Sequence, residues 1–265
     1  MTIPLIDSHC HLDVKEFDED RDDIFSRAAE ARICSMMTLG TDLPSSVRSL
    51  KLARSRPGVY AAVGLHPNDA KGEGPVDWSP YQKLAEDPRV IAWGEIGLDN
   101  HWDFTTPERQ EQVLRDQLAI ARDLHLPISV HIRKAQEDTL RILAEPAFKD
   151  VTGILHCWSG DLKGAQRAID MGFLIGIGGP VTFKNSSLPD IARELPWSSL
   201  VVETDAPYLA PMPRRGKRNE PSLVRYTFDK LVEVKADLDP TDAARMLWTN
   251  FQRVFPRFDL SFDAT

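Results

Sequence analysis

Four histidines and two carboxylates are spaced so that one fold could bring them to one point. Each lies at or near the end of a short apolar run: His9, His11, Glu95, His131, His156 and Asp205. Two of them are only two residues apart, and in a strand residues i and i+2 point to the same side. Imidazoles together with carboxylates suit zinc, manganese or cobalt, and the carboxylates also accept magnesium. The pattern predicts a metal centre.

Glu95 lies in the segment Trp93–Asp99, where Gly94 precedes it and Gly97 follows two residues later. The glycines leave room for an ion to approach the backbone, and the two carboxylate oxygens allow one Glu to bridge two cations. Taken singly, each residue has a simpler explanation. A histidine at the end of a strand is often structural, and a carboxylate after a strand is often a helix cap. The six residues together favour the metal interpretation.

The elements that must position these residues follow from the pattern of apolar runs. Eight short runs read as buried parallel strands: 3–7, 33–39, 59–65, 90–96, 127–132, 151–156, 173–177 and 199–204. Between them lie stretches with helical spacing: 19–31, 45–55, 79–86, 107–124, 135–144, 161–170, 187–194 and 221–235. The clearest of these has Pro107 at its first helical position and continues with an apolar stripe.

Eight alternating strands and helices in 265 residues predict an α/β fold, a single (β/α)₈ TIM barrel. A doubly wound open sheet is the rival, but it does not easily explain polar residues at so many strand ends. In a barrel all these ends lie on one face, where active sites are built. We find no linker or internal repeat, so we expect residues 1–265 to form one domain.

Composition limits the function classes. The net charge is −8, so the chain as a whole has no attraction for nucleic acid, although bound divalent cations could reverse the sign in a pocket. No apolar run is long enough to span a membrane and we see no signal peptide, so we expect a cytoplasmic protein. The three cysteines, Cys10, Cys34 and Cys157, are an odd number at irregular spacing, which fits a reducing compartment. Strand alternation predicts that Cys10 and Cys157 point into the core.

The motifs resemble those of the TatD family of metal-dependent deoxyribonucleases, within the amidohydrolase-like barrels. They follow in this order: Asp7–Asp13, Gly64–Pro67, Gly94–Asp99, Val130–Arg133, His156–Gly160, Glu203–Leu209 and Arg215–Pro221. The resemblance covers nearly the whole chain. One departure is that Asn100, His101 and Trp102 stand where the family usually carries an aromatic pair.

The resemblance implies two divalent metal ions, which we expect to be Zn, Mg or Mn. One would be held by His9, His11, Glu95 and Asp205, and the second by Glu95, His131 and His156, with Glu95 bridging. It also implies DNA as the substrate, commonly with 3′→5′ exonuclease action. We expect cleavage of phosphodiester bonds by a metal-activated water, with Asp205 as the general base beside the catalytic Glu95.

Further residues are candidates for binding the substrate. His66 follows the third run, where it could donate to a phosphate oxygen or hold the turn. Arg133 directly follows a run and suits bidentate phosphate recognition. Arg215, Lys217 and Arg218 belong to a basic loop after the eighth run, which could track a nucleic-acid backbone.

Two other functions stay open. Related barrels use similar ligands on amide, lactone or aminoacyl-ester bonds, but the basic loop favours a nuclease. A non-catalytic binding protein is the third possibility, and the complete ligand set with its base argues against it. We expect single-stranded DNA to be preferred, and a monomer with no obligate protein partner.

Overall fold

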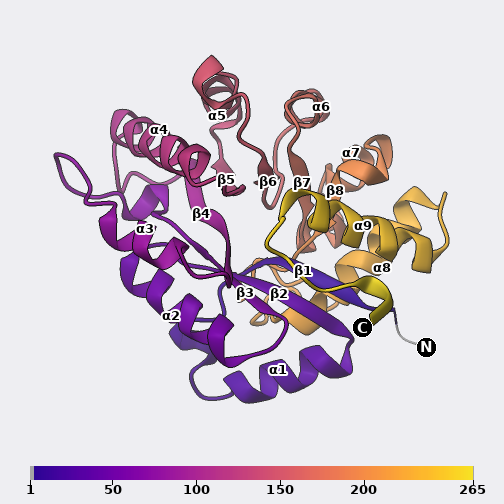
Figure 1. Cartoon of the computed structure of the whole chain (residues 1–265). Helices are drawn as coiled ribbons and strands as arrows, with labels where there is room; N and C mark the ends of the chain where they lie inside the picture. The colour runs from indigo at the N-terminus through magenta and orange to yellow at the C-terminus, as the bar shows by residue number, and fades with distance from the viewer. Residues whose placement is uncertain (1–2, 265) are drawn as a thin grey trace.

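A computed structural model describes residues 3–264. Eight parallel strands follow one another around a barrel in the order of the sequence, and helices surround it (Figure 1). The strands are β1 Leu5–Cys10, β2 Ile33–Leu39, β3 Val59–Val63, β4 Val90–Asp99, β5 Ile128–Arg133, β6 Gly153–Leu155, β7 Leu174–Ile177 and β8 Leu200–Val202. The predicted (β/α)₈ barrel is confirmed, and no doubly wound order occurs among the described strands.

The helices match the eight predicted stretches and add one more. They are α1 Arg21–Glu30, α2 Leu43–Ser55, α3 Ser79–Ala85, α4 Pro107–Asp123, α5 Gln136–Leu143, α6 Leu162–Asp170, α7 Leu188–Glu194, α8 Val224–Lys235 and α9 Pro240–Val254. Local chemistry explains where several begin. The Asp42 side chain accepts a hydrogen bond from the Ser45 amide in a capping box at α2, and Thr106 caps α4 in front of Pro107.

The fourth strand is longer than the sequence suggested. We expected its apolar run to end near Glu95, but β4 continues to Asp99 and all ten of its residues are buried. Its pairing with β5 shifts register between Trp93 and Ile96. Glu95 therefore lies inside the strand, and Asp99 occupies the end that faces the site.

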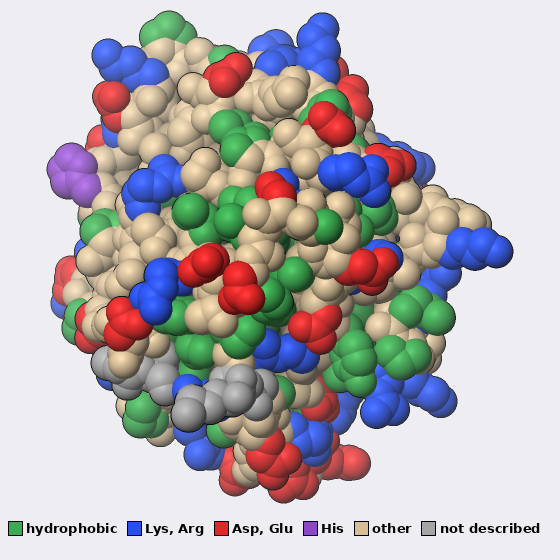
Figure 2. All heavy atoms as spheres, turned by 90° about the vertical axis from the view of Figure 1, so that its right-hand side faces the viewer, with side chains coloured by type: hydrophobic (Ala, Val, Ile, Leu, Met, Phe, Trp, Pro, Cys, Tyr) green, Lys and Arg blue, Asp and Glu red, His purple; other side chains and the backbone are tan. Residues whose placement is uncertain are grey.

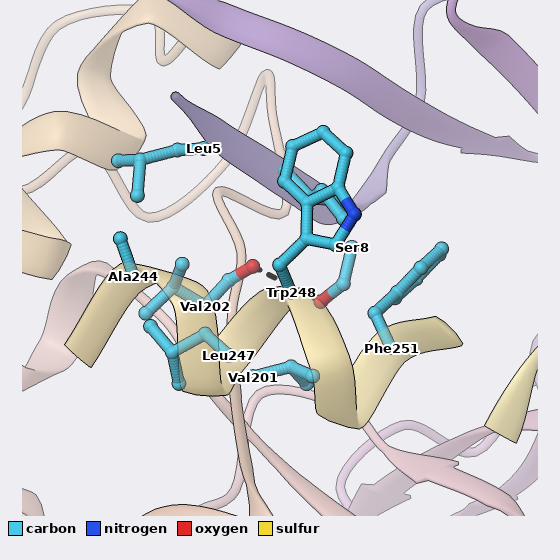
Figure 3. Close-up of a pocket in the computed structure, with 9 residues that line it drawn as sticks. Leu5, Ser8, Val201, Val202, Ala244, Leu247, Trp248 and Phe251 are labelled. Atoms are coloured by element: carbon cyan, nitrogen blue, oxygen red, sulfur yellow. Dashed lines mark hydrogen bonds between the residues drawn. The ribbon is translucent and has the colours of Figure 1, made fainter. Parts of the chain in front are cut away.

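Helix α9 covers the place where the barrel closes. An isolated bridge joins Cys10 of β1 to Ala206, beyond the end of β8, and the Ser8 hydroxyl donates to the Val202 carbonyl of β8 at 3.0 Å. Trp248 and Phe251 of α9 pack against this seam, as Figure 3 shows, around a void of ≈ 10 Å³. A void of that size is at the lower limit for one water. The seam is therefore sealed mainly by apolar packing.

The aromatic residues of the C-terminal segment also close one end of the barrel. Phe255 and Phe258 join Trp248 and Phe251 in a buried cluster with residues from the beginnings of the strands, such as Tyr60 and Ile91. This end is opposite the one at which the polar residues lie. The functional site therefore has a packed floor beneath it.

Figure 2 views the molecule from the right-hand side of Figure 1, and the surface seen there carries both acidic and basic side chains. Acidic and basic side chains are interspersed over the described residues of that face, in keeping with the net charge of −8. None of the described helices is long and apolar enough to cross a membrane.

Candidate metal centre

All six predicted ligand side chains meet at the carboxyl ends of the strands, with Glu95 in the middle. One Glu95 oxygen, Oε1, lies 2.9 Å from His131 Nδ1 and 2.8 Å from His156 Nε2. The other, Oε2, lies 3.5 Å from His9 Nε2 and 3.4 Å from His11 Nε2. The two oxygens thus divide the four histidines into two pairs.

Within each pair the imidazole nitrogens are spaced as ligands of a common ion. His9 Nε2 and His11 Nε2 are 3.3 Å apart, and so are His131 Nδ1 and His156 Nε2. Two nitrogens about 2.0–2.1 Å from a tetrahedral ion would be roughly 3.3 Å apart. Asp205 Oδ1 lies near the first pair, 3.8 Å from His9 and 3.5 Å from His11. The residues present fit the two-ion arrangement.

Three of the four imidazoles are held by a hydrogen bond at the nitrogen that faces away from the cluster. His11 Nδ1 lies 3.1 Å from the Leu39 carbonyl, and His9 Nδ1 lies 3.1 Å from the Ser129 hydroxyl. His131 is turned the other way, with Nε2 3.1 Å from Asp99 Oδ2. A carbonyl or carboxylate can only accept, so His11 Nδ1 and His131 Nε2 carry protons. Their other nitrogens then have lone pairs for a metal.

Asp99 is a residue of the site that the sequence interpretation missed. Besides His131, its carboxylate accepts hydrogen bonds from the Asn68 side chain at 3.0 Å and from the backbone amides of His101 and Trp102 at 2.8 and 3.2 Å. Burial alone would raise the pKa of Asp99, but these donors hold it well below its ordinary value. The alternation of residues 95, 97 and 99 on one strand face would have found it, had the strand been extended.

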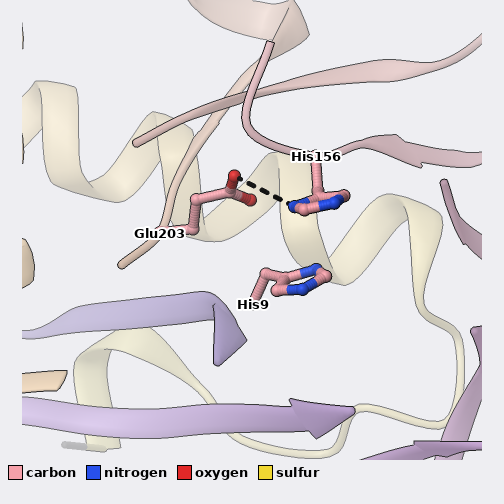
Figure 4. Close-up of side chains that lie close together, drawn as sticks. All are labelled: His9, His156 and Glu203. Atoms are coloured by element: carbon pink, nitrogen blue, oxygen red, sulfur yellow. Dashed lines mark ion pairs between the residues drawn. The ribbon is translucent and has the colours of Figure 1, made fainter. Parts of the chain in front are cut away.

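Glu203 lies behind the fourth imidazole. Figure 4 shows it pointing toward His156, whose ring stacks on His9 with centroids 3.8 Å apart. Glu203 Oε1 is 3.8 Å from His156 Nδ1 and accepts a hydrogen bond from the Cys157 amide. Complete burial raises the pKa of Glu203 well above its ordinary value. His156 presents Nε2 to Glu95, while its Nδ1 faces Glu203 without a hydrogen bond.

The other titratable groups of the cluster have pKa values that depart from their ordinary values because of burial and of one another. Burial opposes charge on His11 and His131, but neighbouring carboxylates outweigh it and raise the pKa of each to about 9. Burial lowers the pKa of His9 to about 4. Burial would raise the pKa values of Glu95 and Asp205, yet the imidazoles around them lower both. Without metal, the site therefore contains three ionised carboxylates, those of Glu95, Asp205 and Asp99, and two imidazolium groups, His11 and His131.

His66 joins the cluster from the end of β3, but its protonation differs. Its Nδ1 accepts a hydrogen bond from the Asn68 amide at 3.1 Å, and its Nε2 lies 3.5 Å from Glu95 Oε1. Burial lowers the pKa of His66 to about 3, so the ring is neutral and its proton is on Nε2. His66 therefore presents a donor to the site.

A cavity of ≈ 1100 Å³ opens above the cluster and is lined by His11, His66, Glu95, Arg133, Asp205 and residues of the surrounding loops. The structure corrects one expectation here. Cys10 is buried as expected, but Cys157 is only partly buried and lines the cavity. Its φ of 45° shows that the chain has already turned after β6, so strand alternation no longer applies.

The basic loop lies to one side of this cavity. Arg218 donates to Asp20 at 2.6 Å and to the Glu16 carbonyl, also at 2.6 Å, so its guanidinium ties the loop to the segment just before α1. Arg215 lies over the Phe183 ring at 4.4 Å, and Lys217 is exposed. None of the three is among the described residues that line the cavity. The structure brings His66 and Arg133 to the site, and leaves this loop at its margin.

Comparison with known proteins decides the family. The sequence model of the family described as TatD related DNase matches residues 6–256. The chain belongs to the TatD family. It is a metal-dependent hydrolase, and its barrel is one that this family shares.

Individual TatD relatives agree with this assignment. The chain is 37% identical over 252 residues to the uncharacterized metal-dependent hydrolase YabD of Bacillus subtilis, covering 95% of this chain and 98% of that one. It is 35% identical over 258 residues to the 3′-5′ ssDNA/RNA exonuclease TatD of Salmonella typhimurium, covering 95% and 98%. The crystal structure of YjjV, a TatD homologue from Escherichia coli, superimposes with a TM-score of 0.90 at 32% identity, covering 97% and 99%.

Proposed function

We propose that this TatD-family hydrolase is a nuclease that cleaves phosphodiester bonds of single-stranded DNA, acting from the 3′ end. The observation that carries the proposal is the division of four histidines between the two oxygens of Glu95, on the floor of a large open cavity. A relative with 35% identity is named as a 3′-5′ ssDNA/RNA exonuclease, which supports this substrate class.

The proposed ligands follow the two pairs of histidines. His9, His11, Glu95 and Asp205 would hold one divalent cation, and Glu95, His131 and His156 the second. When bound, the two cations, which we take to be Zn, Mg or Mn, supply Lewis acidity to the phosphodiester and activate a water.

Asp205 is the proposed general base. Its side chain is 13% exposed to the cavity, whereas that of Glu95 is only 3% exposed, so solvent reaches Asp205 more readily. Its lowered pKa keeps the carboxylate ionised and able to accept a proton from water at neutral pH. Glu95, which is almost covered, holds the two halves of the site together.

The cavity wall supplies groups for the phosphate. Neutral His66 offers its Nε2 proton, and the exposed guanidinium of Arg133 offers a bidentate contact. We keep Arg215 and Lys217 as proposed contacts for more distant phosphates. Arg218 remains in that proposal mainly as the anchor of the loop, because Asp20 and the Glu16 carbonyl already accept its hydrogen bonds.

The alternative substrate class is an amide, lactone or aminoacyl ester. The metal cluster alone does not distinguish it from a phosphodiester. Arg133 in the wall and the basic loop at the margin favour an anionic, extended substrate over a small neutral one.

We also propose that residues 1–265 act as one domain, as a monomer in the cytoplasm. The described residues that line the cavity all belong to one barrel, which supports the proposal of a single domain. Light scattering on the purified protein tests the oligomeric state, and a dimer whose dissociation abolishes activity would contradict it.

The main test is hydrolysis by the purified protein of end-labelled single-stranded DNA, duplex DNA and RNA with Mg²⁺, Mn²⁺ or Zn²⁺. Metal content is measured on the same sample. We expect single-stranded DNA to shorten from its 3′ end and EDTA to abolish the reaction. Absence of nucleotide release with every metal would refute the nuclease function, and turnover of lactones or esters instead would establish the alternative.

A companion variant tests the bridging role. Glu95→Gln should reduce the affinity for both ions together, because each histidine pair faces one Glu95 oxygen. The exposed Glu73→Gln removes the same charge away from the site and should leave both ions bound. Loss of only one ion from Glu95→Gln would contradict the bridge.

The loop is tested by comparing Arg215→Ala/Lys217→Ala with the wild type over a range of salt concentrations. A higher KM for DNA and a shallower salt dependence are expected if these cations neutralise phosphates. An unchanged KM and salt slope would show that the loop does not touch the substrate.

A further inference from the structure

We propose that Trp102 and Phe104 form a stacking platform for unpaired bases of the nucleic-acid substrate, beside the metal cavity. The inference deepens the proposed nuclease function and rests on it. It concerns residues that no ligand assignment includes, on the loop between β4 and α4.

Both rings are exposed to solvent, although large aromatic side chains such as these usually gain stability from burial. Trp102 is 45% exposed and Phe104 is 55% exposed. Their centroids are 5.8 Å apart with planes only 19° from parallel, an offset stack that leaves much of each ring open. Trp102 also lines the cavity, so the stack begins at the cavity rim.

Cations accompany both rings. The Arg133 guanidinium lies 5.6 Å from the Trp102 centroid, and the Lys71 ammonium lies 5.6 Å from that of Phe104. Arg133 lines the cavity too, so one cation is shared between the platform and the proposed phosphate site. Alternation of an aromatic surface with positive charge is the pattern by which proteins bind single strands, with bases on the rings and phosphates on the cations.

The loop is held in place from the metal site. Asp99 Oδ1 accepts the amides of His101 and Trp102, while its Oδ2 accepts His131. On the far side, the Thr105 hydroxyl donates to the Pro67 carbonyl at 2.6 Å. Because Asp99 binds both a proposed metal ligand and the Trp102 amide, the platform has a fixed position relative to the metal cluster.

An unpaired base is the occupant that these features favour. A platform of open ring faces accepts any base, since every base has a π face. Bases within a duplex are already stacked and paired, so they cannot offer such a face without melting. The platform therefore predicts a preference for single strands and little preference for sequence.

The first test is binding without turnover. Fluorescein-labelled octathymidylate and an abasic backbone of the same length are titrated with protein in EDTA at low salt, and anisotropy is measured. The wild type should bind the thymidylate at least tenfold more tightly than the abasic backbone, since stacking contributes roughly five- to a hundredfold per base. In Trp102→Ala/Phe104→Ala this ratio should fall to about threefold or less.

Two variants serve as controls. Trp102→Phe keeps a ring and should retain most of the ratio. Tyr226→Ala removes another exposed aromatic, on α8, and should not change it. A ratio in the Trp102→Ala/Phe104→Ala variant equal to that of the wild type would overturn the platform, as would a wild type that binds both oligomers equally.

The second test separates this proposal from the nuclease function. With metal present, Trp102→Ala/Phe104→Ala should raise KM for thymidylate tenfold or more while kcat changes less than twofold. An equal fall in kcat on thymidylate and on the abasic substrate would indicate structural damage and overturn the platform. A wild type that discriminates thymidylate from abasic backbone in EDTA but hydrolyses neither would refute the nuclease function and leave the platform standing.

Discussion

Replacing Asp99 by Asn should damage one half of the metal site and spare the other. The Asp99 carboxylate accepts from His131 and Asn68 on one oxygen and from two backbone amides on the other. An amide has only one acceptor atom. If its NH₂ faces His131, the imidazole must move its proton to Nδ1, the nitrogen next to Glu95. If its NH₂ faces the loop, it opposes two N–H donors.

Either orientation removes the support that keeps the His131 Nδ1 lone pair available. Loss of such a partner commonly lowers metal affinity or activity about 10–100-fold, which is about 1.4–2.7 kcal/mol. We expect the upper end of this range, because one orientation sets the amide NH₂ against the Asn68 side-chain donor and the other sets it against two backbone N–H groups. His9 and His11 have other partners, Ser129 and the Leu39 carbonyl, so the ion they share should be retained.

The assay is a calorimetric titration of the metal-free protein with Zn²⁺ or Mn²⁺, fitted to two sites, together with kcat on single-stranded DNA. Asp103→Asn is the matched control, since it removes the same charge from an exposed position of the same loop. If Asp99→Asn kept both affinities within twofold of the wild type, or lost both ions equally, the reasoning about His131 would be wrong.

Three further predictions concern protons and packing. Because the pKa values of His11 and His131 are raised to about 9, loading both ions at pH 7 should release about two protons, and metal affinity should decrease as the pH is lowered. Calorimetry in two buffers of different ionisation enthalpy measures the proton release, and zero release would contradict this prediction. Burial raises the pKa of Asp7 to about 7, so in the metal-free chain its contribution to the free energy of unfolding is present below about pH 4 and lost by pH 7. Asp7→Asn should flatten that slope in urea titrations at pH 5 and 7, and an unchanged slope would count against the burial argument. Trp248→Ala at the barrel seam should destabilise the fold by about 3–5 kcal/mol, whereas the exposed Met246→Ala should change it by less than about 0.5 kcal/mol; equal effects would show that α9 does not seal the barrel.

The barrel was predictable because each of its units carries its own local signal. Buried parallel strands read as continuous apolar runs, and Pro107 marks the start of α4 in the sequence as it does in the structure. Helix α9 was missed because it follows α8 without an intervening strand, so it falls outside the alternating pattern. The structural reason for α9 is seen only in the folded chain, where its apolar residues pack over the junction between β1 and β8.

That the six proposed ligand side chains would meet was predictable for a similar reason, since all the strand ends of a barrel lie on one face. What could not be read from the sequence was which groups support the ligands. The length of β4 decides whether Asp99 reaches His131, and a register shift near Glu95 obscures that length in the sequence. The tautomer of His66 depends on the Asn68 amide, and the position of Arg218 depends on Asp20 in a distant segment.

The charges of the cluster suggest how an acidic chain can attract a polyanion. Without metal, the ionised Glu95 and Asp205 are balanced by protons on His11 and His131, so these four groups carry no net charge, and the ionised Asp99 behind His131 leaves the cluster with one negative charge. Exchange of the two protons for two divalent cations would leave Glu95, Asp205, Asp99 and the cations with one net positive charge. That charge is buried at the base of a cavity, where solvent screens it weakly. Attraction of phosphate is therefore a property that the site gains on loading, while the rest of the surface stays acidic enough to disfavour nonspecific binding of nucleic acid.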